Sequence, residues 1–304
     1  MSASPSLSDP TEPHQHTLAG PAVFAGVGLH TGRRVRAAIL PGSADSGIVF
    51  LRTDVRGDGR IEALAGNVSN TRLSTVIGNP SGASVSTVEH LMAALYGLGV
   101  DNALIELDGP EAPILDGSAE PFVRLIDRAG RRRQEAPRQA IEILEVIEVV
   151  DGRKRAALVP AARFELSVEI AFDSAAIGRQ RLDMAVDEDS FRAELAGSRT
   201  FGFLHEVEAL RSAGLAQGGA LENAIVVDGD RVVNPEGLKH PDEFVRHKAI
   251  DAIGDLATLG RPLIGRYEGR LAGHAMNNAL ARAVLANPRA WRLKPPSQAL
   301  AQAV

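Results

Sequence analysis

Short apolar stretches bounded by glycine, proline and aspartate recur along most of the chain, and the spacing of their apolar positions differs between segments. Alternating or clustered apolar positions, typical of β-strands, occur at Val35–Leu40, Gly47–Leu51, Ala103–Leu107, Ile141–Val150, Ala156–Val159, Glu165–Ile170 and Ala224–Val227. Apolar positions at helical spacing occur at Thr87–Leu98, Ala119–Asp127, Leu204–Ser212, Asp242–Leu259 and Ala275–Val284. Because both halves mix helices and strands without a regular βαβ rhythm or a glycine-rich dinucleotide fingerprint, we predict an α+β fold rather than a Rossmann sheet.

A polar segment near the middle of the chain separates the two halves. Residues 131–139 contain three consecutive arginines, further polar side chains and Pro137, so we predict a linker there. It would divide an N-terminal domain, residues 18–130, from a C-terminal domain, residues 140–304. Residues 1–17 are rich in Ser, Pro and His, too polar to be buried, and are expected to form a flexible tail.

The two halves share a short sequence pattern. Thr87–Leu95 and Phe244–Ala252 each contain Val-x-His near the start of a predicted helix. This repeat indicates, though weakly, that the two halves are related by duplication.

The amino-acid composition and the net charge exclude several kinds of cofactor and argue against some classes of function. The 304 residues include no Cys, which excludes disulfides, iron–sulfur clusters and a thiol nucleophile, so any metal must be bound by His, Asp or Glu. With 33 Lys and Arg against 38 Asp and Glu, the formal charge of the chain is −5, which argues against nucleic-acid binding. The basic run Arg131–Arg133 leaves nucleic-acid binding as a weak alternative. We predict no transmembrane segment and a cytoplasmic location, because no long apolar window and no secretory leader are present.

A predicted helix in the C-terminal half carries the strongest candidate for a metal site. His247, Asp251 and Asp255 are spaced by four residues and therefore lie within a sector of about 80° on one helix face. An imidazole and a carboxylate on adjacent turns suit Zn²⁺, which takes three protein ligands where a fourth position is kept for water. We predict that the third ligand is His90 from the other half, beside Glu89 as a potential general base.

Each of these features also has a purely structural interpretation. Residues 86–89 match a capping box, in which the Glu89 carboxylate would only return a hydrogen bond to the backbone of Ser86. His247 and Asp251 could form an ordinary surface pair one helical turn apart. Spacing alone leaves these interpretations open.

Five segments together resemble a known family. They are Gly26–Gly32 (GVGLHTG), Ser86–Leu91 (STVEHL), Pro113–Ala119 (PILDGSA), Arg199–Phe203 (RTFGF) and His247–Leu256 (HKAIDAIGDL). Their order and joint occurrence, from about residue 17 to about residue 290, are similar to the UDP-3-O-acyl-N-acetylglucosamine deacetylases, the zinc enzymes of Gram-negative lipid A synthesis.

The resemblance implies two similar α+β domains, each a β-sheet layered with helices, and one zinc ion per chain at the domain junction. It assigns the metal ligands to His90, His247 and Asp251. It assigns the general base to Glu89, so spacing and resemblance favour the same four residues. The family's second catalytic histidine falls on His274.

The resemblance also implies roles for four further residues. They are Asp255, which orients His274; Thr200, which hydrogen-bonds the oxyanion; Phe201, the aromatic at the sugar; and Lys248, a cation that contacts substrate. Which group protonates the leaving amine, His274 or Glu89, stays open.

A helical insert near residues 198–228 is implied to form a passage for an acyl chain. Leu204, Val207 and Leu210 would give this passage an apolar stripe, although an ordinary core face is the alternative interpretation of the same spacing. Ser74 stands where some relatives carry cysteine beside the passage.

The implied reaction is hydrolysis of the N-acetyl group of UDP-3-O-(3-hydroxyacyl)-N-acetylglucosamine to a free amine and acetate, the committed step of lipid A synthesis. The partner is then a nucleotide-sugar lipid precursor, with no nucleic acid, and the chain is expected to be a monomer. Two alternatives are a zinc amidohydrolase acting on another N-acyl sugar and a non-catalytic protein with a structural metal. Joint presence of Glu89, Asp255 and His274 argues against the second, because a structural zinc usually takes a fourth protein ligand.

Overall fold

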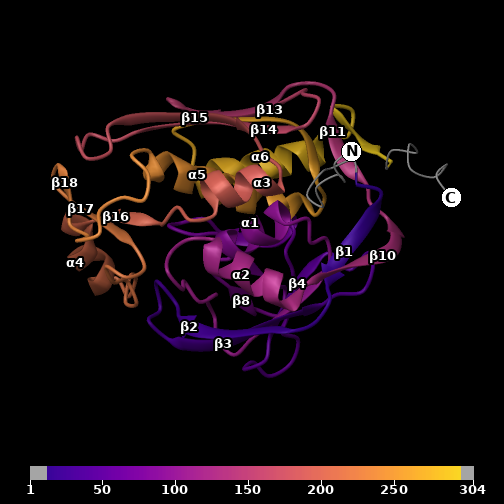
Figure 1. The fold of residues 1–304 in the computed structure, drawn as a ribbon, viewed down its shortest axis with the longest axis horizontal. Helices are drawn as coiled ribbons and strands as arrows, with labels where there is room; N and C mark the ends of the chain where they lie inside the picture. The colour runs from indigo at the N-terminus through magenta and orange to yellow at the C-terminus, as the bar shows by residue number, and fades with distance from the viewer. Residues whose placement is uncertain (1–11, 296–304) are drawn as a thin grey trace.

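The computed structural model describes residues 12–295, whose strands form two main sheets with helices packed between them (Figure 1). The first sheet contains β2 (Ala22–Val27), β3 (Arg34–Pro41), β4 (Ile48–Arg52), β5 (Arg60–Glu62) and β9 (Ala103–Leu107). Its order is β2-β3-β9-β4-β5, with β4 and β9 parallel and the other neighbours antiparallel. Val35, Ala37 and Ile39 alternate along β3 with more exposed residues, so they face the helices.

The C-terminal half repeats this arrangement. Its strands are β12 (Ile147–Asp151), β13 (Lys154–Val159), β14 (Phe164–Ala171), β15 (Arg179–Ala185) and β19 (Leu263–Arg270). They pair in the order β12-β13-β19-β14-β15, with β14 and β19 parallel, which matches the first sheet in order and direction. Two further strands, β11 (Ala140–Ile143) and β20 (Trp291–Lys294), extend the sheet from β19.

The helices between the sheets also follow the repeat (Figure 1). They are α1 (Glu89–Gly97), α2 (Glu120–Ala129), α5 (Glu243–Leu256) and α6 (His274–Ala286). In chain order α1 precedes β9 and α2 follows it, just as α5 precedes β19 and α6 follows it. The two Val-x-His sequences therefore lie at equivalent helices, and α1 and α5 pack directly against each other.

A glycine allows this helix contact to be close. A Cβ at Gly254 of α5 would lie 2.0 Å from the main-chain oxygen of Glu89, so a larger residue would push the two helices apart. The start of α1 thereby lies beside the turn of α5 that carries Asp251.

Each half has an insertion before its first central helix. The first contains η1 (Ala65–Asn67), β6 (Val68–Asn70), β7 (Val76–Gly78) and β8 (Ser84–Val85). The second contains α3 (Glu188–Ser190), the π-helical turn η2 (Phe191–Leu195), β16 (Phe201–Phe203), α4 (Leu204–Ser212), β17 (Ile225–Asp228) and β18 (Arg231–Val232). The small sheet β16-β17-β18 and α4 lie together at one end of the molecule (Figure 1).

Each predicted helix and strand has an observed counterpart with shifted bounds, but several observed strands were not predicted, among them β2, β15 and the central strand β19. The predicted helix at Leu204–Ser212 coincides with α4, and α5 continues as a short 3-10 turn, η3 (Ala257–Leu259). The strand expected at Ile141–Val150 is instead two strands, because the main-chain nitrogens of Leu144 and Glu145 turn toward the carbonyl of Ala290. Within residues 12–295, no helix is both long enough and apolar enough to cross a membrane.

Two segments correct the sequence prediction. The end of the expected flexible tail forms β1 (His14–Leu18), and most of the expected linker forms β10 (Arg131–Pro137); the two strands pair antiparallel. Thr17 is fully buried, and its hydroxyl donates to the carbonyl of Asn102. The Arg131 guanidinium donates to the Glu188 carboxylate. These polar side chains are ordered by distant hydrogen bonds rather than by apolar burial, while residues 1–11 lie outside the described range.

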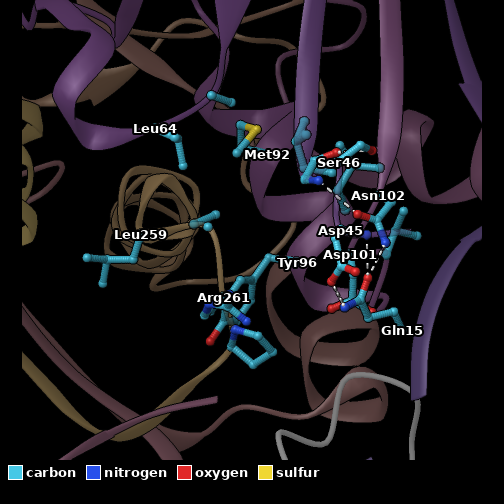
Figure 2. A pocket seen from close by; sticks show the side chains of 18 of the residues that line it. Gln15, Asp45, Ser46, Leu64, Met92, Tyr96, Asp101, Asn102, Leu259 and Arg261 are labelled. Carbon is cyan, nitrogen blue, oxygen red and sulfur yellow. Dashed lines mark hydrogen bonds between the residues drawn. The ribbon is translucent and has the colours of Figure 1, made fainter. Parts of the chain in front are cut away.

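A cavity of about 320 Å³ lies at the junction of the halves, near the C-terminal end of α1 (Figure 2). Met92 and Leu259 contribute to its apolar side. On its polar side, Gln15 Nε2 donates to Asp45 Oδ1 at 2.7 Å, and Asn102 Nδ2 donates to Gln15 Oε1 at 2.8 Å. These hydrogen bonds hold β1 against the N-terminal half.

Candidate metal centre and active site

Three side chains from the two central helices converge where α1 meets α5. The Nε2 atoms of His90 and His247 lie 3.6 Å and 3.4 Å from Asp251 Oδ1. The two imidazole rings are 4.9 Å apart and nearly perpendicular, and one ligand atom from each of the three residues lies within 4.8 Å of the others. All three side chains are buried. The alternative of an exposed surface pair at His247 and Asp251 is therefore wrong.

The protonation states of the cluster suit metal binding. His247 Nδ1 lies 3.1 Å from the carbonyl oxygen of Ser198, which can only accept, so Nδ1 carries the proton and Nε2 keeps its lone pair. Burial lowers the pKa of His247 to about 3, which keeps the ring neutral. Although burial alone would raise the pKa of Asp251, the Lys248 ammonium 2.7 Å from its Oδ2 and the neighbouring His247 hold that pKa well below its usual value.

Glu89 lies at the start of α1, next to the cluster. Its buried carboxylate accepts a hydrogen bond at Oε2 from the main-chain nitrogen of Thr75, at 3.0 Å. Burial raises the pKa of Glu89, as a base that takes up a proton requires. The capping-box interpretation is wrong, because the Ser86 nitrogen donates to the Pro110 carbonyl instead.

His274 begins α6 and faces the same cluster. Its Nε2 lies 3.9 Å from Glu89 Oε1 and 4.0 Å from Asp251 Oδ2, and its Nδ1 lies 2.9 Å from Asp255 Oδ2. Burial alone would lower the pKa of His274, but the Asp255 carboxylate, together with the nearby charges of Glu89 and Asp251, raises it to about 9. The raised pKa favours the protonated imidazole at neutral pH.

Two residues that the sequence analysis missed hold the Asp255 carboxylate. The Thr75 hydroxyl donates to its Oδ1, and Asn277 Nδ2 donates to its Oδ2 at 2.8 Å. The buried Tyr267 hydroxyl in turn donates to Asn277 Oδ1. A threonine or asparagine far away in the sequence carries no local signal of such a contact, although Asn277 lies on the same helix as His274, one turn later.

The segment before α4 lies against the same site. Phe201 lies with its ring 6.3 Å from the His247 ring, and Lys248 Nζ lies 5.7 Å from the centre of the Phe201 ring. Thr200, next in the chain, is fixed by main-chain hydrogen bonds to Gly117 and Ile225. The structure thus brings Phe201 and Lys248 to the cluster, while the predicted contact of Thr200 with an oxyanion stays a prediction.

Helix α4 carries the predicted apolar stripe. Val207 and Leu210 are half-buried, and Leu204 is 44% exposed. None of the residues of α4 is fully buried. The alternative of an ordinary core face is therefore wrong for this helix.

The side chains that converge here are suited to bind a divalent metal ion and to transfer protons. Two buried imidazoles and a carboxylate can hold a divalent ion, and the side chains of Glu89 and His274 lie beside this cluster, where they could transfer protons. Metal-dependent hydrolases are the class of protein that this fold and site define.

Comparison with known proteins identifies the family within that class. Residues 15–286 match the family model described as UDP-3-O-acyl N-acetylglycosamine deacetylase. A UDP-3-O-acyl-N-acetylglucosamine deacetylase from Phenylobacterium zucineum (strain HLK1) is 63% identical over 95% of this chain and 99% of the relative. Proteins of the same name from Myxococcus xanthus (strain DK1622) and Acidithiobacillus ferrooxidans (strain ATCC 53993 / BNL-5-31) are each 49% identical, over 94% and 91% of this chain and 91% of each relative. The chain belongs to this family of deacetylases.

Proposed function

We propose that this chain catalyses zinc-dependent hydrolysis of the N-acetyl group of UDP-3-O-(3-hydroxyacyl)-N-acetylglucosamine. The products are the free amine and acetate, and the reaction is the committed step of lipid A synthesis. The observation that carries the proposal is the convergence of His90, His247 and Asp251 beside the buried carboxylate of Glu89. Family membership supplies the substrate class.

His90, His247 and Asp251 are the residues proposed to hold the zinc ion. Zinc bound there would supply Lewis-acid activation of water and of the acetamide carbonyl. The donor set fits the ion, since both rings and the carboxylate are buried and the proton on His247 Nδ1 is held by a carbonyl. Because all three ligands come from one chain, a monomer completes the site.

Glu89 is proposed to take the proton from the attacking water. Its Oε2 is held by the Thr75 nitrogen, which leaves Oε1 for proton transfer. Burial raises the pKa of the carboxyl and so makes it a stronger base than an exposed glutamate.

A second proton transfer is needed when the amine leaves. The His274 imidazole, protonated and oriented by Asp255, can donate from Nε2, which lies 3.9 Å from Glu89 Oε1. Glu89 can alternatively return the proton that it took. The Thr200 hydroxyl is proposed to hydrogen-bond the oxyanion, with Phe201 and Lys248 at the sugar.

Chelation tests the metal requirement directly. Purified protein is expected to contain one zinc per chain, to lose its deacetylase activity when a chelator removes the metal, and to regain that activity when Zn²⁺ is added back. Metal content by atomic spectrometry and acetate release are measured on the same samples. Full activity in protein that has been emptied of metal would contradict the proposal.

The stripe on α4 is proposed to line a passage for the 3-O-acyl chain. Each methylene buried there would contribute about 0.8 kcal/mol to binding. Val207→Asp is expected to lower kcat/KM for the long-chain substrate at least ~10-fold more than for the same substrate without the chain, because the charge would face methylenes in a dry channel. Both substrates are assayed with each variant.

Ala209→Asp is the matched control, since it adds the same charge to an exposed position of α4 off the stripe. It should leave the ratio of the two kcat/KM values unchanged. Equal losses on both substrates in Val207→Asp, together with a lower Tm, would reject the passage.

A further inference from the structure

We propose that Thr75 is a positioning residue for the reaction, which sets the Glu89 carboxylate and the His274 imidazole in one fixed arrangement. The inference rests on the proposed function, because it concerns the two side chains assigned there to proton transfer. Thr75 is almost completely buried, at 1% exposure, and comes directly before β7. No part of the sequence analysis gave it a role.

The main chain of Thr75 holds the start of α1. Its nitrogen donates to Glu89 Oε2 at 3.0 Å, and its carbonyl accepts from the nitrogen of Val88 at 3.4 Å. The hydrogen bond from Thr75 fixes Oε2 of Glu89, the proposed base. Because the carboxylate is planar, holding Oε2 also restricts the position of Oε1.

The side chain of Thr75 holds a second carboxylate, on α5. Its hydroxyl donates to Asp255 Oδ1, while Asp255 Oδ2 accepts from His274 Nδ1 at 2.9 Å and from Asn277 Nδ2 at 2.8 Å. Asp255 is itself buried, so a lost donor cannot be replaced readily by bulk water. Without the hydroxyl, Oδ1 loses its donor and the carboxylate is held through Oδ2 alone, so the carboxylate and the imidazole that it orients are fixed less tightly.

The two contacts link different halves of the molecule. Thr75 and Glu89 belong to the N-terminal half, whereas Asp255 and His274 belong to the C-terminal half. Glu89 Oε1 and His274 Nε2, 3.9 Å apart, are thus linked through one residue, whose main-chain nitrogen donates to Glu89 and whose hydroxyl donates to Asp255, the partner of His274. A β-branched residue suits this position, because its restricted χ1 fixes the direction of the hydroxyl.

The proposed test is Thr75→Val, which keeps the shape of the side chain and removes the hydroxyl. Because small misplacements of reacting groups are costly, kcat is expected to fall about 10–100-fold with KM within about 3-fold and zinc content unchanged. Thr75→Ser, which restores the donor, is expected to return kcat to within about 3-fold of the wild type.

Thr258→Val is the matched control. Thr258 is equally buried at 1% exposure, and its hydroxyl also donates to Asp255, but to the main-chain oxygen rather than the carboxylate. The control should lower Tm as Thr75→Val does and leave kcat near the wild-type value. If the two valine variants lose the same fraction of kcat, Thr75 has only a structural role and the proposal is wrong.

A second measurement does not depend on activity. In metal-free protein the ring Nδ1 proton of His274, hydrogen-bonded to Asp255, should give a downfield NMR signal that persists in Thr75→Ser and Thr258→Val but shifts or broadens in Thr75→Val. An unchanged signal together with unchanged kcat in Thr75→Val would overturn the proposal. If Thr75→Val does not fold, Thr75→Ala removes the hydroxyl without placing a methyl against the carboxylate and replaces it in both measurements. A wild type without deacetylase activity would instead overturn the proposed function.

Discussion

The Glu89→Gln variant is expected to retain its zinc and to turn over about 10²–10⁴-fold more slowly than the wild type, the usual size of a general-base contribution. A glutamine fills the same volume, and its side-chain oxygen can still accept the hydrogen bond from the Thr75 nitrogen. It cannot take a proton from water. The loss should therefore fall on kcat at saturating substrate, with zinc content and Tm measured on the same preparation.

Tm separates this chemical effect from a structural one. Glu89 makes no capping contact with Ser86, so removal of its charge should not weaken the start of α1. A folded, zinc-loaded Glu89→Gln with near-normal kcat would eliminate Glu89 as the base.

His247→Ala is expected to lose metal and activity together. Removal of one of three protein ligands leaves His90 and Asp251, one from each helix, with no third donor in the described cluster. Since the metal contributes several kcal/mol to transition-state stabilisation, activity should fall on the order of 10³-fold or more. Zinc per chain and kcat/KM are compared at equal protein concentration.

His16→Gln provides the control, because His16 is also a buried imidazole but lies in β1, outside the cluster. That variant should keep one zinc per chain even if its Tm falls. A His247→Ala protein that binds zinc as tightly as the wild type would show that the ligand assignment is wrong.

Much of the fold follows from local pattern. The spacing of apolar residues predicted the main helices and many of the strands, because the positions that face the sheets recur at the period of each element. It did not detect β2, β15 or β19. Strands β1 and β10 were missed for a physical reason. Thr17 and Gln15 are ordered by hydrogen bonds to residues more than 25 positions away, and hydrophobic periodicity cannot detect such contacts.

The site, like the fold, could be predicted from the sequence only in part. His247 and Asp251 could be paired from the sequence alone, because residues four apart share a helix face. Their partnership with His90 depends on how α1 packs against α5, and the sequence indicated it only through the neighbouring Glu89 and the family motifs. Thr75 gave no sequence signal, because its importance arises entirely from where the two halves meet.

The equivalent placement of α1 and α5 has an evolutionary consequence. An ancestor of half the length, with one sheet and this helix, would form the same contact as a two-fold homodimer, with one histidine from each copy facing the other across the axis. The carboxylates break that symmetry: when the Val-x-His sequences are aligned, Glu89 stands opposite Arg246 and Asp251 opposite Ala94. Because the two repeats lie in one chain, their sequences can differ, and here the C-terminal repeat supplies the acidic ligand Asp251 while the N-terminal repeat supplies Glu89.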